Sequence, residues 1–307
     1  MSVIGIDTSN YTTSIAFFDG VGGENCSRLL PVKAGELGLR QSDAVFAHIK
    51  SIPELSGRLF SHVQKDKITA IGVSTRPRAV EGSYMPCFMV GYSHAKLLSD
   101  ALQVPLIEVS HQQGHVAASL WSADRLELMD MPHLAWHLSG GTTALLLVEP
   151  EGRNVKCTKI GGTTDISAGQ LIDRTGQLLE LPFPSGKHLD ALSRNAVKKD
   201  VFKVKCSDFQ FSLSGVQNKV QQYHAANQDP VETSGYALRC VAKAVYLATE
   251  QALKAYPGLP VVFSGGVASN SMLREVIAPL NPIFSQPQFS TDNAMGVAVL
   301  AHRMTEV

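Results

Sequence analysis

The chain has 307 residues, of which 44% are hydrophobic and 18% are charged, and its 27 lysines and arginines balance its 27 aspartates and glutamates. These values are typical of a globular protein that is long enough for two domains. A net charge of zero excludes a global basic field, so a nucleic acid would have to be held by a local patch or by a partner protein. The local candidates are Lys198, Lys199, Lys203 and Lys205, for which a solvated charged turn is the commoner explanation.

The cysteine content and the apolar runs indicate the compartment. Five cysteines without a C-x-x-C spacing argue against a disulfide framework and against a structural zinc knuckle. The N-terminal residues lack the basic region and long apolar core of a signal peptide. No apolar run approaches the ~18 residues that a membrane span needs. We therefore expect a reduced, cytoplasmic protein.

The first predicted elements are a strand, a small-polar turn and a second strand over residues 3–19. A further strand is predicted over 104–109, and Ser110 after it suits the cap of a helix N-terminus. His111 and His115 would then lie one turn apart on one face of that helix, as two ligands of a divalent metal do. Because ten histidines give roughly 0.3 such pairs by chance, two partly exposed histidines without a metal are the alternative.

A second hairpin is predicted over residues 133–148, with the same form as the first. Similar hairpins about 130 residues apart suggest a duplicated domain. At its tip, Gly140 and Gly141 permit a positive φ and close approach of the backbone to an anion. A plain hairpin turn is the simpler explanation of these glycines.

The middle of the chain predicts a helix that contains Asp173 and ends at the turn 181–186. For an aspartate in the middle of a helix, a solvated carboxylate is the usual explanation. Further on, an apolar run over 259–264 leads through two glycines to a predicted helix at 271–277. A buried strand, a glycine turn and a helix N-terminus suit a phosphate or a nucleotide.

The last predicted helix covers residues 294–302, and Asp292 stands just before it. Taken locally, a cap of this helix is a commoner role for Asp292 than metal binding.

Seven motifs, in this order over nearly the whole chain, resemble those of the TsaD (glycoprotease-like) family of the actin/hexokinase/Hsp70 superfamily. Each motif alone is weak, whereas seven in register are specific. They are Gly5-Ile6-Asp7-Thr8-Ser9, the pair His111 and His115, Ser139-Gly140-Gly141-Thr142-Thr143 against S-G-G-H-T, residues 165–175 against D-x-A-G-E-x-x-D-K-T, Pro184-Ser185-Gly186 against P-G-G, residues 265–270 against G-G-V-x-x-N, and Thr291-Asp292-Asn293 against T-D-N.

The resemblance implies an α/β fold of two duplicated ribonuclease-H-like lobes with an interlobe cleft. One lobe would comprise residues 1–110 and 290–307, and the other, with most nucleotide contacts, residues 111–289. The resemblance also implies an acyltransferase that moves the threonylcarbamoyl group from threonylcarbamoyl-AMP to N6 of adenosine 37 in tRNA. Implied partners are tRNA, a smaller paralogous TsaB-like subunit and a TsaE-like ATPase.

The same resemblance implies the site residues. One divalent metal, Fe²⁺ or Zn²⁺, would be held by His111, His115 and Asp292, which reverses the local preference for Asp292 as a cap. An adenine nucleotide, threonylcarbamoyl-AMP or ATP/ADP, would contact Leu138, Ser139, Gly140, Gly141, Thr142, Asp173, Gly186 and Asn270. No nucleophile–base pair is evident, so we expect direct transfer without a covalent enzyme intermediate.

Three departures from the family pattern lie near the expected nucleotide. Thr142 replaces the histidine of S-G-G-H-T, Gln217 stands at a family lysine, and the turn 75–79 lacks the family's G-P-G. A divergent paralogue that serves as a regulatory or scaffold subunit is therefore an alternative. A metallopeptidase is less favoured, because Gln112 stands where H-E-x-x-H proteases carry their general base. A small-molecule kinase of the same superfold is also less favoured, because a metal bound by a histidine pair would be unusual in such an enzyme.

Overall fold

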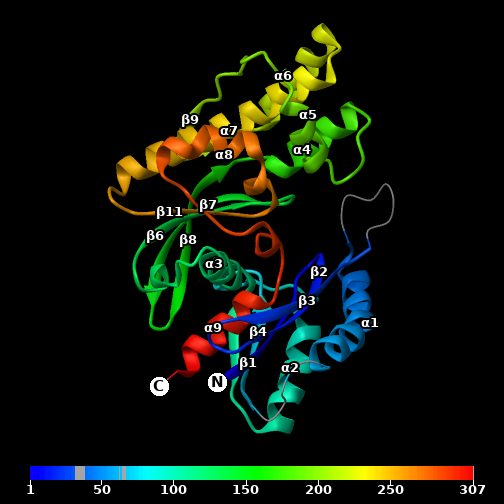
Figure 1. The fold of residues 1–307 in the computed structure, drawn as a ribbon, viewed down its shortest axis with the longest axis vertical. Helices are drawn as coiled ribbons and strands as arrows, with labels where there is room; N and C mark the ends of the chain where they lie inside the picture. Colours follow the sequence, from blue (N-terminus) through cyan, green and yellow to red (C-terminus); the bar gives the residue numbers. More distant parts are fainter. Residues whose placement is uncertain (32–38, 62, 64–66, 307) are drawn as a thin grey trace. The chain divides into compact units, whose positions relative to one another are not determined.

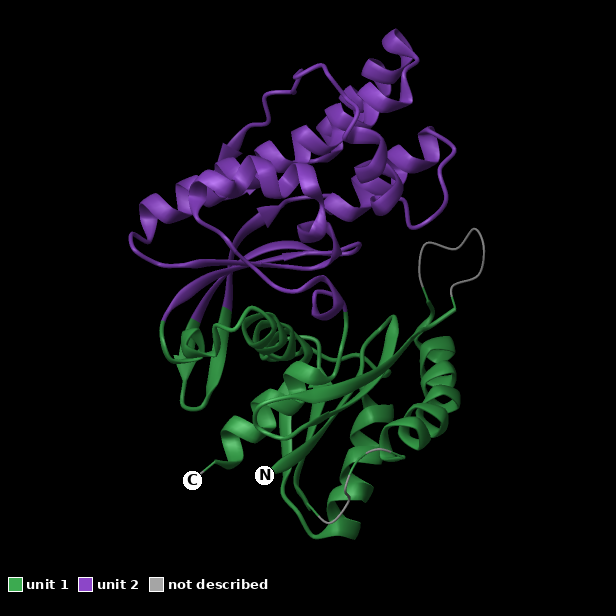
Figure 2. Ribbon diagram, in the orientation of Figure 1, with its two compact units in different colours: residues 1–131, 149–157, 292–307 green, residues 132–148, 158–291 purple. Residues whose placement is uncertain are grey.

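The computed structural model describes residues 1–31, 39–61, 63 and 67–306 (Figure 1). The chain forms two compact units (Figure 2). Unit 1 comprises residues 1–131, 149–157 and 292–307, and unit 2 comprises residues 132–148 and 158–291. Residues 111–131 and 149–157, which were expected in the second lobe, thus fall in unit 1, and residues 290–291, expected in the first lobe, fall in unit 2. The helix that begins at residue 111 packs on the C-terminal helix of unit 1.

Unit 1 is built on a five-stranded sheet in the order β3-β2-β1-β4-β5. Strands β1, β2 and β3 form an antiparallel meander, and β4 and β5 continue the sheet parallel to β1. Their bounds are β1 Ser2–Thr8, β2 Thr12–Phe18, β3 Gly23–Leu29, β4 Ile68–Arg76 and β5 Leu106–Ser110. The helices are α1 Gln41–Phe60, α2 Phe88–Leu102, α3 His111–Ser122 and α9 Met295–Thr305, with a 3-10 turn η2 at Leu126–Asp130.

Strand β1 is buried on both faces, and the period-2 alternation of its side chains divides them between two layers. Ile4 and Ile6 face the cluster formed with α1 and α2. Val3 packs with Ala301 of α9, and a Cβ at Gly5 would come within 2.7 Å of the backbone nitrogen of Ala298. Helices therefore cover both faces of the sheet, and Gly5 lets α9 lie close to β1.

Unit 2 repeats this arrangement. The five strands β8-β7-β6-β11-β12 correspond in order to β3-β2-β1-β4-β5, with β6 and β7 antiparallel and with β11 and β12 parallel to β6 and to each other. A short pair, β10 and β9, extends the edge beyond β8. The bounds are β6 His133–Leu138, β7 Thr143–Glu151, β8 Asn154–Thr163, β9 Cys206–Ser207, β10 Gln210–Phe211, β11 Val261–Ser264 and β12 Ile283–Phe284. The duplication predicted from the two hairpins is confirmed.

The core of unit 2 gathers around the 26-residue helix α7. The indole nitrogen of Trp136 on β6 donates to the hydroxyl of Thr249 on α7 at 2.8 Å, which satisfies a buried donor. The helices are α4 Ala168–Leu178, α5 Gly186–Ser193, α6 Ser214–Asn227, α7 Pro230–Ala255 and α8 Ser271–Ile277, with 3-10 turns η3 Gly266–Ser269, η4 Ala278–Leu280 and η5 Pro287–Phe289.

All five cysteines are free thiols. Among the helices of the described residues, none combines the length and apolarity that a membrane crossing requires.

Candidate metal centre

The two histidines are placed by a capping box at the junction of β5 and α3. The hydroxyl of Ser110 accepts from the backbone nitrogen of Gln113 at 3.3 Å, and the Gln113 side chain accepts from the backbone nitrogen of Ser110 at 2.8 Å. This reciprocal pair starts the helix at His111. His111 and His115 consequently lie one turn apart on the same face, as predicted.

Helix α9 reaches α3 at a glycine contact. A Cβ at Gly296 would collide with the carbonyl oxygen of Gly114, and a Cβ at Gly114 would lie 3.1 Å from Val297. Two glycines thus let the helices touch backbone to backbone. This contact places the segment before α9, which carries Asp292, beside the two histidines.

Asp292 does not cap α9, so the local preference for that role was wrong. The N-cap of α9 is Ala294, without a side-chain cap bond, and the amide oxygen of Asn293 accepts from the backbone nitrogen of Met295 at 3.1 Å. The Asp292 carboxylate turns to the histidines instead and accepts from the Ser9 hydroxyl at 3.2 Å. Tertiary contacts therefore override the local sequence signal.

The three side chains converge on one point. His111 Nε2 lies 2.9 Å from His115 Nε2, and Asp292 Oδ1 lies 3.1 Å from His115 Nε2 and 3.5 Å from His111 Nε2. Within the described residues, these three form the group of His, Cys, Asp or Glu that could hold a metal ion. Ligands about 2.0–2.2 Å from a tetrahedral metal stand roughly 3.3 Å apart, so the set fits a Zn²⁺-sized ion.

Asp7, to which the sequence analysis gave no role, orients the first histidine. Its Oδ1 lies 2.9 Å from His111 Nδ1 and also accepts from the Ser74 hydroxyl, while its Oδ2 is buried without a hydrogen-bond partner. A proton on Nδ1 leaves the lone pair of Nε2 facing His115 and Asp292. An acidic residue at the end of an otherwise apolar strand was the signal that could have identified it.

The two carboxylates make the centre a site for positive charge. Burial alone would raise the pKa of Asp7, but the charge and hydrogen bond of His111 and the Ser74 hydroxyl hold it below its usual value. Burial likewise opposes ionisation of Asp292, yet His111 and His115 hold its pKa well below the usual range. Burial lowers the pKa of His111, but Asp7 and Asp292 outweigh it and raise that pKa to about 10.

In unit 2, the expected nucleotide turn is closed by its own hydrogen bonds. The backbone nitrogen of Ser139 donates to the carbonyl of Thr142 at 2.8 Å, and the backbone nitrogen of Thr142 donates to the Ser139 hydroxyl at 3.1 Å. Gly140 and Gly141 permit a positive φ but do not adopt one. Close approach does occur, because a Cβ at Gly169 would meet the backbone of Gly140 at the start of α4.

The second glycine turn packs against the first. Gly265 has a φ of 93°, and a Cβ there would collide with the carbonyl of Leu138. The turn continues as η3 before α8 begins, and Asn270 caps α8 by accepting from the backbone nitrogen of Leu273 at 3.0 Å. Asp190, which the sequence analysis missed, accepts from the backbone nitrogen of Ser271 at 2.9 Å.

The structure also groups Asp173 with Gly186. Asp173 Oδ1 accepts from the backbone nitrogen of Ser185 at 2.9 Å, directly before Gly186 at the start of α5, and burial raises the pKa of this carboxyl. A Cβ at Gly186 would meet open space. At the departure from the family lysine, the Gln217 side chain accepts from the Arg174 guanidinium at 2.7 Å. A cation thus lies beside the position where the family carries one.

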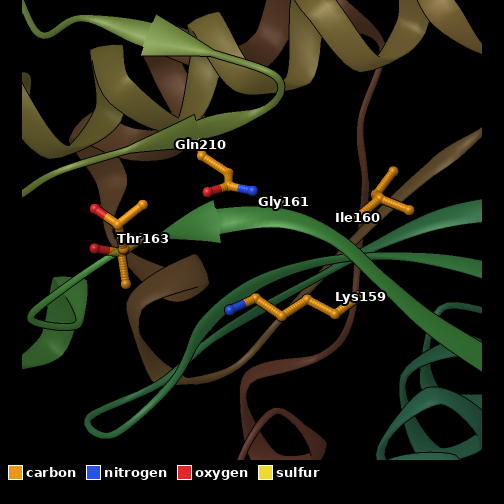
Figure 3. Close-up of a pocket in the computed structure, with 6 residues that line it drawn as sticks. Lys159, Ile160, Gly161, Thr163 and Gln210 are labelled. Atoms are coloured by element: carbon orange, nitrogen blue, oxygen red, sulfur yellow. The ribbon is translucent and has the colours of Figure 1, made fainter.

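A hollow of about 400 Å³ lies elsewhere in unit 2, along the end of β8 next to β10 (Figure 3). None of its lining residues belongs to the expected site. They are Lys159, Ile160, Gly161, Thr163, Thr164 and Gln210.

Solved structures define the class. Full-length HypF, in a phosphate- and nucleotide-bound form, matches 100% of this chain and 47% of its own with a TM-score of 0.65 at 14% identity. The ROK hexokinase of Thermus thermophilus matches 100% of both chains with a TM-score of 0.55 at 14% identity. Together with the repeated sheet, these matches confirm the duplicated α/β fold of the actin/hexokinase type.

Sequence comparisons identify the family. The model of the TsaD family, described as tRNA N6-adenosine threonylcarbamoyltransferase, matches residues 38–299, so the chain belongs to this family. A relative of that name from Carboxydothermus hydrogenoformans is 33% identical over 83% of this chain and 77% of its own. One from Streptococcus suis is 31% identical over 79% of this chain and 73% of its own. The resemblance predicted from the seven motifs is confirmed.

Proposed function

We propose that this protein transfers the threonylcarbamoyl group from threonylcarbamoyl-AMP to N6 of adenosine 37 in tRNA. Family membership supports the reaction, and the relatives carry that transferase name. The observation that carries the proposal is the convergence of His111, His115 and Asp292. The triad is retained although Thr142 departs from the family pattern.

For the metal, we propose Fe²⁺ or Zn²⁺ bound by His111 Nε2, His115 Nε2 and a carboxylate oxygen of Asp292. When bound, the metal would act as a Lewis acid toward oxygens of the mixed anhydride. Asp7 would hold His111 in the tautomer that presents Nε2, and Ser9 would orient Asp292 by donating to Oδ2. Gln112, with a side-chain amide, cannot serve as the general base of a peptidase.

For the nucleotide, we propose contacts from unit 2. Within the Ser139–Thr142 turn, Gly140 and Gly141 would offer their backbone N–H groups without side-chain obstruction, since a Cβ at either glycine would meet nothing within 4 Å. Asp173 would accept from ribose hydroxyls, and Gly186 leaves room beside it. The remaining contacts in this proposal are Leu138 and Asn270.

The proposed chemistry is one displacement at the carbamoyl carbon. The bond from this carbon to the phosphate oxygen breaks, the bond to N6 of adenosine forms, AMP leaves with the electron pair, and N6 releases one proton. Adenylate is a good leaving group, so positioning contributes more than a dedicated base. An acylated enzyme trapped during turnover would contradict direct transfer.

The proposed partners are tRNA, a smaller TsaB-like paralogue and a TsaE-like ATPase. The net charge of zero suits an enzyme that shares the binding of tRNA with partner subunits. A tRNA substrate also makes the cytoplasm the proposed compartment.

The proposal is tested by a transfer assay with supplied threonylcarbamoyl-AMP, tRNA and the two partner proteins. We expect product from the wild type, a loss of at least 100-fold in His111→Ala, and little change in His94→Ala, a histidine on α2. Metal analysis of the same preparations should give stoichiometric Fe or Zn in the wild type, and substoichiometric metal in His111→Ala. Normal product from His111→Ala would overturn the metal mechanism. No product from a metal-loaded wild type would favour the regulatory paralogue.

A further inference from the structure

The segment 197–206, which we call the lysine strap, connects α5 to β9 without helix or turn and can be followed in Figure 1 from one element to the other. At its start, the backbone nitrogens of Val197 and Lys198 donate to the buried carboxylate of Glu232 at 2.9 and 3.1 Å. At its end, the Gln251 side chain donates to the carbonyl of Cys206 at 3.0 Å. Both anchoring side chains belong to α7, so the strap is fastened along that helix.

The distance between these anchors requires an extended backbone. Glu232 and Gln251 are 19 positions apart on α7, which corresponds to about 28 Å along the helix axis. The nine steps from Val197 to Cys206 reach about 30 Å when fully extended. The strap is therefore extended, and burial alternates from residue 201 to residue 206, with the odd-numbered side chains exposed and the even-numbered ones more buried.

The even-numbered side chains of the strap contact the protein, although Lys198 and Asp200 are themselves exposed. The Lys198 amine donates to the amide oxygen of Asn227 at 2.8 Å, and the Asp200 carboxylate accepts from the Tyr223 hydroxyl at 3.3 Å. Val204 is buried in the core of unit 2, and Phe202 and Cys206 pack against that core.

The odd-numbered side chains are all exposed, and three of them are lysines. They are Val197, Lys199, Val201, Lys203 and Lys205. Within the described part of the chain, no ion pair involves Lys199, Lys203 or Lys205. Lys219 on α6 adds a fourth cation, with its amine 5.9 Å from the ring centre of Phe202.

We propose that Lys199, Lys203 and Lys205 bind the phosphate backbone of RNA, with the tRNA substrate as the RNA. The choice of tRNA rests on the proposed function. Three ammonium groups on one line about 20 Å long match a polyanion with regularly repeated charge, and each lysine acts as a point charge toward one phosphate. The strap exposes only two valines as apolar side chains, which is little for a docked protein surface.

The test compares two variants that lose the same charge. One is the triple variant Lys199→Gln/Lys203→Gln/Lys205→Gln. The control, Lys50→Gln/Lys96→Gln/Lys156→Gln, removes three exposed lysines of unit 1. Binding to an unmodified tRNA transcript is measured between 50 and 200 mM salt, and the melting temperature of each variant verifies folding.

We expect the strap variant to bind at least tenfold more weakly at the lowest salt concentration. The slope of log K against log salt should become shallower by about 2, since each phosphate contact contributes roughly 0.7–0.9. The control should keep the wild-type slope. An unchanged slope in the strap variant, an equal loss in the control, or a wild type that does not bind tRNA would each overturn the inference. So would a strap variant that loses binding to phosphatidylserine vesicles while it keeps its affinity for tRNA.

The transfer assay separates this inference from the proposed function. A strap variant with a raised KM for tRNA and an unchanged kcat supports both. If the strap variant binds tRNA more weakly with a shallower salt slope while the wild type forms no product, the RNA surface is supported and the transferase activity is contradicted. Product formed at an unchanged KM for tRNA retains the transferase and removes the RNA surface.

Discussion

His111 Nδ1 and Asp7 Oδ1 lie 2.9 Å apart, so a buried carboxylate at the end of the first strand holds the imidazole at the start of α3. Outer carboxylates of this kind typically contribute 10–100-fold to the metal affinity of a histidine site. We expect Asp7→Ala to weaken Zn²⁺ binding by that factor, as measured by calorimetric titration of the metal-free protein. Asp7→Asn, which keeps an acceptor oxygen, should lose less. Asp43→Ala, an exposed aspartate of α1, is the matched control, and wild-type affinity in Asp7→Ala would remove the orienting role.

The backbone contact between Gly296 and Gly114 makes a second prediction. In Gly296→Ala the new methyl group collides with the carbonyl of Gly114, which forces α9 away from α3. Overpacking of this kind costs about 1–3 kcal/mol of unfolding free energy. Gly57→Ala, on α1 where a Cβ meets open space, should instead gain up to about 1 kcal/mol. Denaturant melts measure both, and a Gly296→Ala protein as stable as the wild type would show that the helices can separate at no cost.

Asn270 has a structural role and a proposed ligand role, and two substitutions separate them. Asn270→Ala removes the cap of α8 and should cost about 1 kcal/mol, whereas Asn270→Ser keeps a capping oxygen and should cost little. If the side chain also contacts the nucleotide, Asn270→Ser should weaken ADP binding at least several-fold without lowering the melting temperature. If Asn270→Ser binds ADP with wild-type affinity, Asn270 caps α8 and does not contact the nucleotide.

Asp165 makes stability depend on pH. Burial would raise its pKa, but the hydroxyls of Ser212 and Ser214 and the backbone nitrogens at the start of α6 hold it well below the usual value. Because the folded pKa is depressed, the carboxylate contributes its full stability above its unfolded pKa of about 3.9. This contribution is lost progressively as the pH falls from that value towards the depressed folded pKa.

The corresponding experiment follows the melting temperatures of wild type and Asp165→Asn from pH 7 to pH 3. The variant should melt lower at pH 7, and the difference between the two curves should begin to narrow below about pH 4. Asp43→Asn, at an exposed position, should follow the wild type at every pH. A constant difference between wild type and Asp165→Asn over the whole range would contradict an ionic role.

The sequence was a good guide where a few neighbouring residues decide the structure. The alternation of apolar residues predicted both hairpins, and Ser110 predicted the start of α3 and thereby the shared face of His111 and His115. The family motifs were also visible, and the family match confirms them.

Local signals were misleading where a distant segment competes for the same group. Asp292 has the position of a helix cap, yet the histidines and Ser9 take its carboxylate. The glycines of the 139–142 turn permit a left-handed backbone, yet it is Gly265, more than a hundred residues away, that adopts a positive φ where it meets Leu138.

The sequence by itself therefore determined the repeated strand patterns, the helix start that pairs His111 with His115, and the family. Only the tertiary structure decided that Asp7 orients His111, that the glycines of α3 and α9 bring Asp292 to the pair, and that three lysines of the strap face outward together. The physical reason is range. Caps and alternation depend on residues within one or two turns of the chain, whereas a buried carboxylate finds its partner only when the packing of distant elements has excluded water from both.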